Sequence, residues 1–300
     1  LIFNQGEAAN YDVNIGDKTW STTEIPRSIT ILSGAVTLNE SRNVTTAVLV
    51  SSGATLNSNG NLTIRSGGKI DVSGTITGNV TFEQEITGTQ GWRTLAAPVS
   101  STTVADVMSG LWSQGFTGAS TTEGNANVRT FNGSAYVAPS NATDAIGVGK
   151  GFAALIFADD NFDGVADAFP KTMSATGTVV TTDVQVTLNQ GLDVLTLVGN
   201  PYSSTIDTDL LTSTSTNLYG TVYSYSNSAG EFISWNGSIG SLTNGLIAPF
   251  QSFFVRNNSA NASTLSVPTS ARVTQNVSKE GSAPGLITFK STMGDLKSSA

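Results

Sequence analysis

The sequence predicts an all-β fold: a short β-solenoid-like N-terminal part followed by a duplicated β-sandwich-like module with one short helix per repeat. Three observations predict it: alternating segments that end at glycines in the first third, a set of motifs that recurs after residue 90, and a short helical pattern after each copy's first motif. The predicted boundaries are a solenoid-like stretch over 1–88, a duplicated module over 89–280 with repeats of about 91–190 and 191–280, and a C-terminal strand or linker over 281–300.

Short strands are predicted between residues 28 and 82, where apolar and polar residues alternate. A Ser-Gly corner ends three of these segments, at Gly34, Gly53 and Gly67. Alternation of this kind is typical of strands with one buried face. A recurring corner with two short strands per unit favours the rungs of a β-solenoid, although an ordinary antiparallel meander would give a similar pattern.

The duplication rests on three landmarks at nearly one offset, because Gly91 and Gly191, Pro98 and Pro201, and Phe152 and Phe253 are 100, 103 and 101 residues apart. The segment at 91–102 is echoed at 191–205, the aromatic strand at 128–136 by that at 221–225, and the apolar strand at 148–157 by that at 247–255. A short helix is predicted in each copy, from Val104 to Leu111 and from Ile206 to Leu211. One alternating strand over 178–189 is predicted between the copies, 263–277 takes the matching place after the second, and the tail holds a strand candidate at 286–289.

Composition excludes several classes of function. The 300 residues include no His and no Cys, which removes Ser-His-Asp triads, thiolate nucleophiles and His- or Cys-ligated zinc. The net charge is −8 and the basic residues are scattered singly, so we expect no nucleic-acid partner. No apolar run is long enough to span a membrane. The chain starts at Leu1 without the features of a signal peptide, so we expect either a processed secreted protein or an internal fragment.

Several segments occur in an order that resembles a known architecture. They are Lys-Thr-Trp-Ser at 18–21 with Ile-Pro at 25–26, Ser-Ser-Gly-Ala-Thr-Leu at 51–56 with Asn-Leu-Thr-Ile at 61–64, Gly-Trp-Arg-Thr-Leu-Ala-Ala-Pro at 91–98, Leu-Val-Gly-Asn-Pro-Tyr at 197–202 and Pro-Phe-Gln-Ser-Phe-Phe-Val at 249–255. The ordered set resembles type IX-secreted, adhesin-like surface proteins of Bacteroidota. The resemblance implies export across the outer membrane and a C-terminal sorting domain, whose features this sequence does not show. Members of the family include very large adhesins and enzyme-bearing chains.

An acidic loop at 159–167 carries the sharpest local pattern, D-x-N-x-D-G-x-x-D. Alternating oxygen-bearing side chains with a glycine at the sixth position let a short loop wrap a hard cation. The pattern predicts a structural Ca²⁺ held by side-chain oxygens of Asp159, Asn161, Asp163 and Asp167 and by the carbonyl of Val165. The bidentate Glu of a full EF-hand is missing, because Pro170 stands at that position. An acidic hairpin tip without a metal is the alternative.

Two features bear on carbohydrate chemistry. Glu83 and Glu85 lie two apart on one face of a predicted strand, and paired carboxylates can hydrolyse glycosides, although a solvated strand face is the commoner reason for such a pair. Trp235 lies in a polar segment and is the candidate for an exposed, ligand-binding aromatic ring.

Together these features predict a non-enzymatic structural or adhesion module of a secreted protein, located outside the cell or on its outer surface. The expected partners are the secretion machinery, a host or environmental surface or glycan, and copies of the chain itself. Two other functions stay open: a carbohydrate-binding or carbohydrate-active module, and a subunit of a self-assembling extracellular filament whose terminal strand pairs with the next copy.

Overall fold

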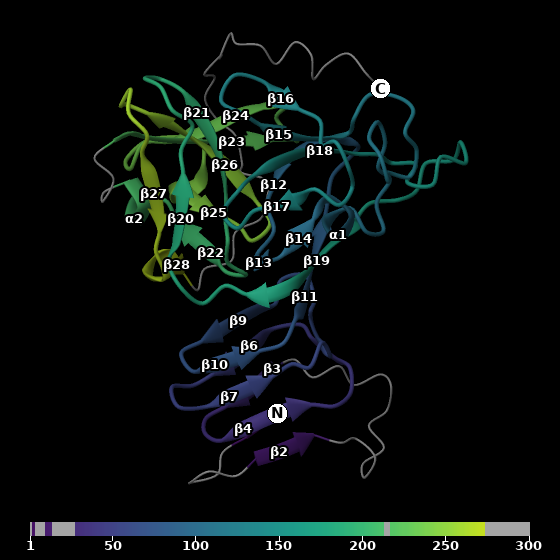
Figure 1. Cartoon of the computed structure of the whole chain (residues 1–300), viewed down its shortest axis with the longest axis vertical. Helices are drawn as coiled ribbons and strands as arrows, with labels where there is room; N and C mark the ends of the chain where they lie inside the picture. The colour runs from purple at the N-terminus through teal and green to yellow at the C-terminus, as the bar shows by residue number, and fades with distance from the viewer. Residues whose placement is uncertain (1, 4–9, 14–27, 213–216, 274–300) are drawn as a thin grey trace.

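The structure is a computed structural model that describes residues 2–3, 10–13, 28–212 and 217–273. Its described part is mostly β, as the sequence predicts, with short parallel sheets near the N-terminus and antiparallel sheets later in the chain. Figure 1 shows the parallel strands gathered at one end of the molecule and the antiparallel sheets at the other. None of the helices within these residues is long and apolar enough to cross a membrane.

Residues 28–86 form what we call the parallel stack. The chain passes three times through three parallel sheets, and each pass adds one strand to each sheet. The first pass is β3 (Ser28–Ile31), β4 (Ala35–Leu38) and β5 (Arg42–Val44); the second is β6 (Ala47–Val50), β7 (Thr55–Asn57) and β8 (Leu62–Ile64); the third is β9 (Lys69–Val72), β10 (Thr75–Thr77) and β11 (Val80–Ile86). Two earlier strands, β1 (Ile2–Phe3) and β2 (Asn10–Val13), pair in parallel with β3 and β4.

Parallel pairing in this region rules out the antiparallel meander for residues 28–86. Equivalent residues stack in register, as where Ile31 lies beside Val50 and Val50 beside Val72. The expectation of two strands per unit is wrong, because each pass also includes a third, short strand such as β5. The three glycines do not mark one repeated corner, because Gly34 and Gly53 occupy the same corner whereas Gly67 lies at another, between β8 and β9. All three have a positive φ that suits glycine.

The alternation of the stack strands buries one face of most of them. Along β3 and β6 every second residue is buried, and the same pattern continues in the passes that follow. The buried residues are branched and aliphatic, which suits a pleated surface packed on one side. They belong to one hydrophobic core cluster, which continues from the stack into the first antiparallel region through residues such as Phe82, Val99 and Met173.

The stack is joined to the rest of the chain by a shared sheet. β11 pairs in parallel with β8 and in antiparallel fashion with β19 (Lys171–Val179), over seven residue pairs from Val80–Gly177 to Ile86–Lys171. β19 also pairs with β13 (Val99–Ser100). The resulting order β13-β19-β11-β8-β5 makes one five-stranded sheet out of both regions. In Figure 1, β11 and β19 lie where the two parts of the molecule meet.

Residues 91–179 and 184–273 form what we call the first and second antiparallel units. Each contains a four-stranded sheet with the same arrangement, β12-β18-β15-β16 in the first unit and β21-β26-β23-β24 in the second. The strands are β12 (Gly91–Leu95), β15 (Val128–Phe131), β16 (Tyr136–Val137) and β18 (Phe152–Ile156), and β21 (Leu195–Gly199), β23 (Leu218–Ser226), β24 (Glu231–Trp235) and β26 (Ser252–Asn257).

Smaller elements also recur between the two units. A short helix follows a short strand in each: α1 (Val104–Val107) after β14 (Thr102–Thr103), and α2 (Asp209–Thr212) after β22 (Thr205–Asp207). These strands pair with β17 (Ala145–Ile146) and with β25 (Leu246–Ile247), and β22 also pairs with β28 (Arg272–Val273). Thr103 caps α1 in a reciprocal capping box with Asp106. Two short 3-10 helices, at Thr243–Gly245 and Thr269–Ala271, lie in the second unit.

The predicted single strand over 178–189 is wrong, because the chain forms two strands there. β19 ends at Val179, and β20 (Val184–Thr187) begins a separate pairing with β27 (Thr264–Val267). The break follows from the partners: β19 is held by β11 in the shared sheet, while β20 belongs to the second unit and its own core cluster. Alternation alone does not reveal where a strand changes partner.

The two antiparallel units pack against each other through aromatic rings. Phe254 of β26 makes edge contacts with Phe131 and Tyr136 of the first unit, with ring centroids 5.1 and 6.5 Å away, and with Phe232 of its own unit. A backbone bridge between Leu95 and Gln251 adds to this contact. The described residues therefore form a continuous body from the stack to the second unit.

Candidate functional site

The acidic loop lies between β18 and β19, in the first antiparallel unit. Phe162, which has a positive φ of 55°, fixes its tip: the ring stacks on Trp112 with centroids 4.3 Å apart and meets Phe157 edge-on at 5.1 Å. A positive φ is uncommon for a bulky residue, so this turn is maintained by its surroundings. At the start of the loop the backbone N–H of Ala158 donates to Gln90 Oε1 at 3.1 Å.

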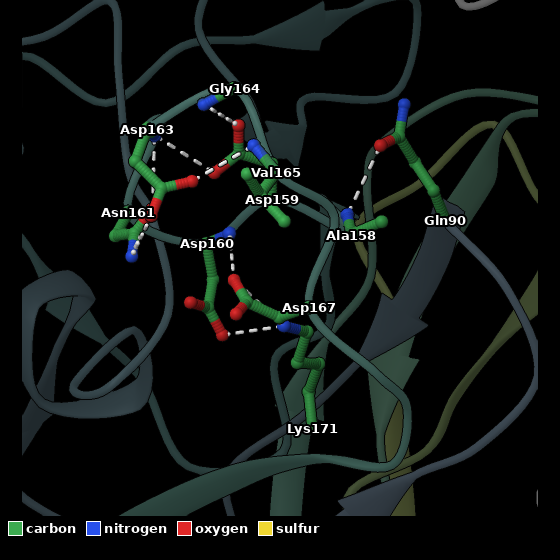
Figure 2. A network of polar contacts seen from close by, with 10 residues as sticks. All are labelled: Gln90, Ala158, Asp159, Asp160, Asn161, Asp163, Gly164, Val165, Asp167 and Lys171. Carbon is green, nitrogen blue, oxygen red and sulfur yellow. Dashed lines mark hydrogen bonds and ion pairs between the residues drawn. The ribbon is translucent and has the colours of Figure 1, made fainter.

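One polar group of the loop gathers Asp159, Asn161 and Asp163. Both carboxylate oxygens of Asp159 accept backbone N–H groups, from Asp163 at 3.2 Å and from Gly164 at 2.9 Å. Asn161 Oδ1 accepts the N–H of Asp163, and Asp163 Oδ1 accepts that of Val165 at 2.8 Å. Figure 2 shows these contacts as a compact turn in which the side chains bend back onto the loop backbone.

A second polar group gathers Asp160, Asp167 and Lys171. The ammonium of Lys171 lies 2.6 Å from Asp160 Oδ2 and 3.7 Å from Asp167 Oδ2, and Asp167 Oδ2 also accepts the backbone N–H of Asp160 at 3.2 Å. The side chain of Lys171 is only 5% exposed, whereas the two carboxylates are more open to solvent. The Lys171 ammonium lowers the pKa of the Asp160 carboxyl from its ordinary value, and its hydrogen bond is the main cause. Figure 2 shows this group beside the first one, on the inner side of the loop.

The predicted calcium ligands are thus divided between the two groups. Asp159, Asn161 and Asp163 lie together, while Asp167 faces Lys171. Within the described residues, no three acidic side chains converge as a ready-made metal cluster. The donor chemistry nevertheless suits a hard cation, because carboxylate oxygens that accept one backbone N–H keep a further lone pair. The calcium shell stays a prediction, and Val165 stands on the exposed side of the loop with 67% of its surface accessible.

An open hollow of about 410 Å³ lies against the second group. Its walls come from the loop, from the segment after α1 and from the joint between β11 and β19. Besides Asp160, Asp167 and Lys171, its polar lining includes Glu83, Ser109, Thr172 and Ser174. The hollow gives dissolved ions and small polar molecules access to the charged side chains of the loop.

Glu83 and Glu85 on β11 differ in their surroundings. Glu83, on β11, forms an ion pair at 2.6 Å with Arg65, the residue that follows β8, and this contact links adjacent passes of the stack. Glu85 is exposed, and its backbone N–H donates to Ser66 Oγ. One carboxylate of the pair is therefore engaged in a salt bridge across the sheet.

Trp235 ends β24 and is half buried. Its indole N–H donates to Asp209 Oδ1 of α2 at 2.7 Å, and its ring lies close over Gly245, where a Cβ would come within 2.4 Å of the indole. The ring also packs against the core of the second unit. The structure places Trp235 in a packing role that connects β24, α2 and the short helix at Thr243–Gly245.

Lys171 and Asp160 are the site residues that sequence reasoning missed. The cation-binding pattern skips Asp160 and ends at Asp167, before Lys171. A signal was present: Lys171 stands four residues after Asp167 and is the first basic residue after four aspartates. A lone cation next to an acidic run is the natural partner for its surplus charge.

Some predicted features lie outside the described residues, namely the motifs at 18–21 and 25–26 and the strand candidate at 286–289. In comparisons with known proteins, no family model matches this chain, and neither a curated protein nor a solved structure matches it significantly.

Proposed function

We propose that this chain is a structural and adhesive module of a secreted cell-surface protein. The observation that carries the proposal is the five-stranded sheet β13-β19-β11-β8-β5, which unites the parallel stack with the first antiparallel unit. A flexible linker would let the two regions reorient, whereas seven paired residues between β11 and β19 and a common core hold them in one orientation. Fixed spacing of this kind suits a protein that holds a binding surface away from a cell.

The finer architecture belongs to the same proposal. The three passes in register support a short β-solenoid, in which each pass covers the core of the one before it. The matching orders β12-β18-β15-β16 and β21-β26-β23-β24 support two copies of one sandwich-like module, each with a short helix. Duplicated and stacked units lengthen a protein without a larger single core.

Calcium is the proposed structural cofactor of the acidic loop. Asp159, Asn161, Asp163 and Asp167 would supply side-chain oxygens, and Val165 its carbonyl. Four aspartates within nine residues repel one another, and a divalent cation would offset that repulsion. Bound calcium is expected to raise the melting temperature, with Asp163→Asn abolishing the shift and Asp71→Asn, on the exposed face of β9, leaving it unchanged.

The location follows from the resemblance to type IX-secreted, adhesin-like proteins, and the secretion machinery and an external surface or glycan are the proposed partners. The test is to probe intact cells that make the natural full-length protein. Antibodies raised against residues 28–273 should label intact cells, added protease should remove the label, and the purified module should reduce adhesion by competition. Labelling that appears only after lysis would overturn the proposal.

Carbohydrate binding is the second candidate, and the hollow beside the acidic loop favours it. Carboxylates and hydroxyls such as Glu83, Asp160 and Ser174 can bond to sugar hydroxyls within a space of about 410 Å³. A glycan array with the wild-type protein and with Ser174→Leu, which would fill the hollow, tests this candidate. Binding that is lost in the variant supports it, and an array without a hit contradicts it.

A further inference from the structure

The oxygen of one exposed side-chain amide in the first antiparallel unit is surrounded by hydrogen-bond donors. Asn132 begins the turn that joins β15 to β16. Its Oδ1 accepts three hydrogen bonds: from the backbone N–H of Ser134 at 3.0 Å, from the Ser134 hydroxyl at 3.0 Å and from the N–H of Ala135 at 2.9 Å. Donors aimed at a carbonyl oxygen stabilise negative charge there, so the carbon of this amide becomes a better target for a nucleophile.

The nucleophile stands one residue further along the chain. The backbone nitrogen of Gly133 can attack Cγ of Asn132 and close a five-membered ring. Glycine has no side chain to shield that nitrogen, and it tolerates the φ of 102° found at this position. Within the residues that the structure describes, the N–H of Gly133 donates no hydrogen bond that would restrain it. Asn132 itself is exposed, so water can reach the ring once it has formed.

The reaction balances with water as its only co-reactant. The nitrogen of Gly133 forms a bond to Cγ of Asn132, the amide nitrogen leaves as ammonia with the proton from Gly133, and a cyclic imide remains. Water then opens the imide at one of its two carbonyls and gives aspartate or isoaspartate. Negative charge develops on Oδ1 during the attack, and hydrogen bonds to a charged oxygen are stronger than those to a neutral one. The three donors therefore favour the transition state over the resting amide.

The pair at Asn236 has the same Asn-Gly-Ser sequence but a smaller set of donors. Its Oδ1 accepts two backbone N–H groups, from Ser238 at 3.1 Å and from Ile239 at 2.8 Å. A Cβ on the glycine that follows Asn236 would lie 3.6 Å from Oδ1 of Asp209. The charge of that carboxylate opposes a second negative charge nearby. The two Asn-Gly-Ser sites therefore differ in their folded surroundings and not in their sequence.

Two further Asn-Gly pairs lack the arrangement as well. At Asn244 the N–H of Gly245 donates to the carbonyl of Leu242 at 3.4 Å, and Gly245 is buried against the ring of Trp235. At Asn59 the side-chain amide accepts no hydrogen bond within the described part of the chain. A nitrogen that is already bonded attacks less readily, and an amide without donors is less activated.

We propose that Asn132 is a self-modification site of this protein: the turn that holds it promotes deamidation of its amide to aspartate and isoaspartate. The product carries a new carboxylate, and isoaspartate also adds a carbon to the backbone. Both changes fall where the turn meets the second unit, because a Cβ on Gly133 would lie 3.1 Å from Asn189 and from Val194. The contact between the two antiparallel units therefore changes with time in solution, without any enzyme.

Ser134→Ala and Ser238→Ala test the proposal as a matched pair. Each removes the hydroxyl of an Asn-Gly-Ser sequence, but the Ser134 hydroxyl bonds to the Asn132 amide, whereas the Asn236 amide is bonded by backbone groups. The folded protein is incubated at mildly alkaline pH, and peptide mapping by mass spectrometry follows deamidation at each asparagine. In the wild type, Asn132 should react several-fold faster than Asn236. Ser134→Ala should slow Asn132 by about two- to tenfold, the factor that one hydrogen bond contributes, and Ser238→Ala should leave Asn236 unchanged.

The same measurement in urea gives the reference, because the unfolded chain removes the donors of both turns. Asn132 and Asn236 should then react at similar rates, and Ser134→Ala should have no effect. If the folded turn only held Asn132 rigid, its rate relative to Asn236 would be lower in the folded protein than in urea, and the proposal would be wrong. Equal rates at the two sites in the folded protein, or an unchanged rate in folded Ser134→Ala, would overturn it as well.

Discussion

The strand pairs β11·β19, at the first antiparallel unit, and β20·β27, in the second, differ in whether a further strand pairs with them. β19 of the first unit pairs with β11, the last strand of the stack, and β11 pairs on its other side with β8. In the second, β20 pairs with β27, which is its one strand partner among the described residues, and the ammonium of Lys150 donates to the Thr187 carbonyl at 2.8 Å. Unpaired strand edges invite further strands, and lysine is a common means of blunting them. The β11·β19 pair therefore joins the first unit to the stack, whereas the β20·β27 pair of the second unit ends at a strand edge that Lys150 contacts.

Removing the side chain of Phe82 should break the joint and have the largest effect. Phe82 lies on β11 opposite Ala175, is 2% exposed, and belongs to the core shared by the stack and the first unit. Phe82→Ala should lower the free energy of unfolding by about 3–5 kcal/mol, because it leaves a cavity in that core. Urea denaturation measures the loss, and hydrogen exchange should accelerate on both sides of the joint.

The matched change in the second unit is Val186→Ala on β20. Val186 is buried in the separate core of the second unit, so faster exchange should be confined to residues 184–273. If Phe82→Ala were to accelerate hydrogen exchange in the second unit as strongly as in the stack, the proposed difference between the β11·β19 and β20·β27 pairs would be wrong.

Asn200 gives the next largest effect, and it marks a difference between the units. It precedes Pro201, as Ala97 precedes Pro98 in the first unit. Its buried amide donates to the carbonyls of Ser204 at 2.9 Å and of Ile247 and Ala248 at 3.1 Å. Asn200→Ala should cost about 1–3 kcal/mol, because these buried carbonyls lose a donor.

Chemical denaturation of Asn200→Ala tests this, with exposed Asn261→Ala as the control. Asn261 is exposed on the segment between β26 and β27. A loss no greater than that of the control would show that the amide is dispensable to the second unit.

Acid should weaken the first unit through Asp160. Its folded-state pKa lies below the ordinary 3.8, chiefly through the hydrogen bond from Lys171, so its ionised form stabilises the folded state above that pH. This contribution is lost as the pH falls through the lowered folded-state pKa. Below about pH 4, the free energy of unfolding should therefore fall more steeply in the wild type than in Asp160→Asn.

Asp183 is the counterpart at the second unit. Hydrogen bonds from the backbone N–H and the hydroxyl of Thr269 lower its pKa in the same direction. Asp183→Asn should likewise make the free energy of unfolding fall less steeply below about pH 4 than in the wild type. Its structural effect should be confined to the β20·β27 pair. Parallel pH curves for wild type and Asp160→Asn would contradict the assignment to Lys171.

Lys150 should have the smallest effect on stability. It is exposed, and Lys150→Ala should change the free energy of unfolding by no more than about 0.5 kcal/mol. Removing the amine leaves the Thr187 carbonyl open, so self-association should increase in sedimentation velocity. Lys150→Arg retains a donor and should stay like the wild type. A monomeric Lys150→Ala at high concentration would show that the edge is closed by other means.

Local patterns predicted the strands of this protein better than their partners. The alternation at 28–31 and 47–50 and the echo of 91–102 in 191–205 located strands correctly, because burial of one face and a repeated motif depend on neighbouring residues. The three-strand passes and the break between Val179 and Val184 were missed, because they depend on which distant strand each segment meets. At the candidate site, the acidic pattern identified the loop, but Lys171 contacts it only because β19 begins where the loop returns to the sheet.

The β11·β19 ladder also bears on how the chain folds. Residues 80–86 find their antiparallel partners roughly 90 positions later, at 171–177, so this closure is a high-contact-order step. Until β19 has been made and has docked, the last strand of the stack exposes an unpaired edge and part of its apolar face, which are the features that recruit chaperones or lead to aggregation. We therefore expect formation of the β11·β19 ladder, which joins the stack to the first unit, to be a slow and aggregation-prone step of folding.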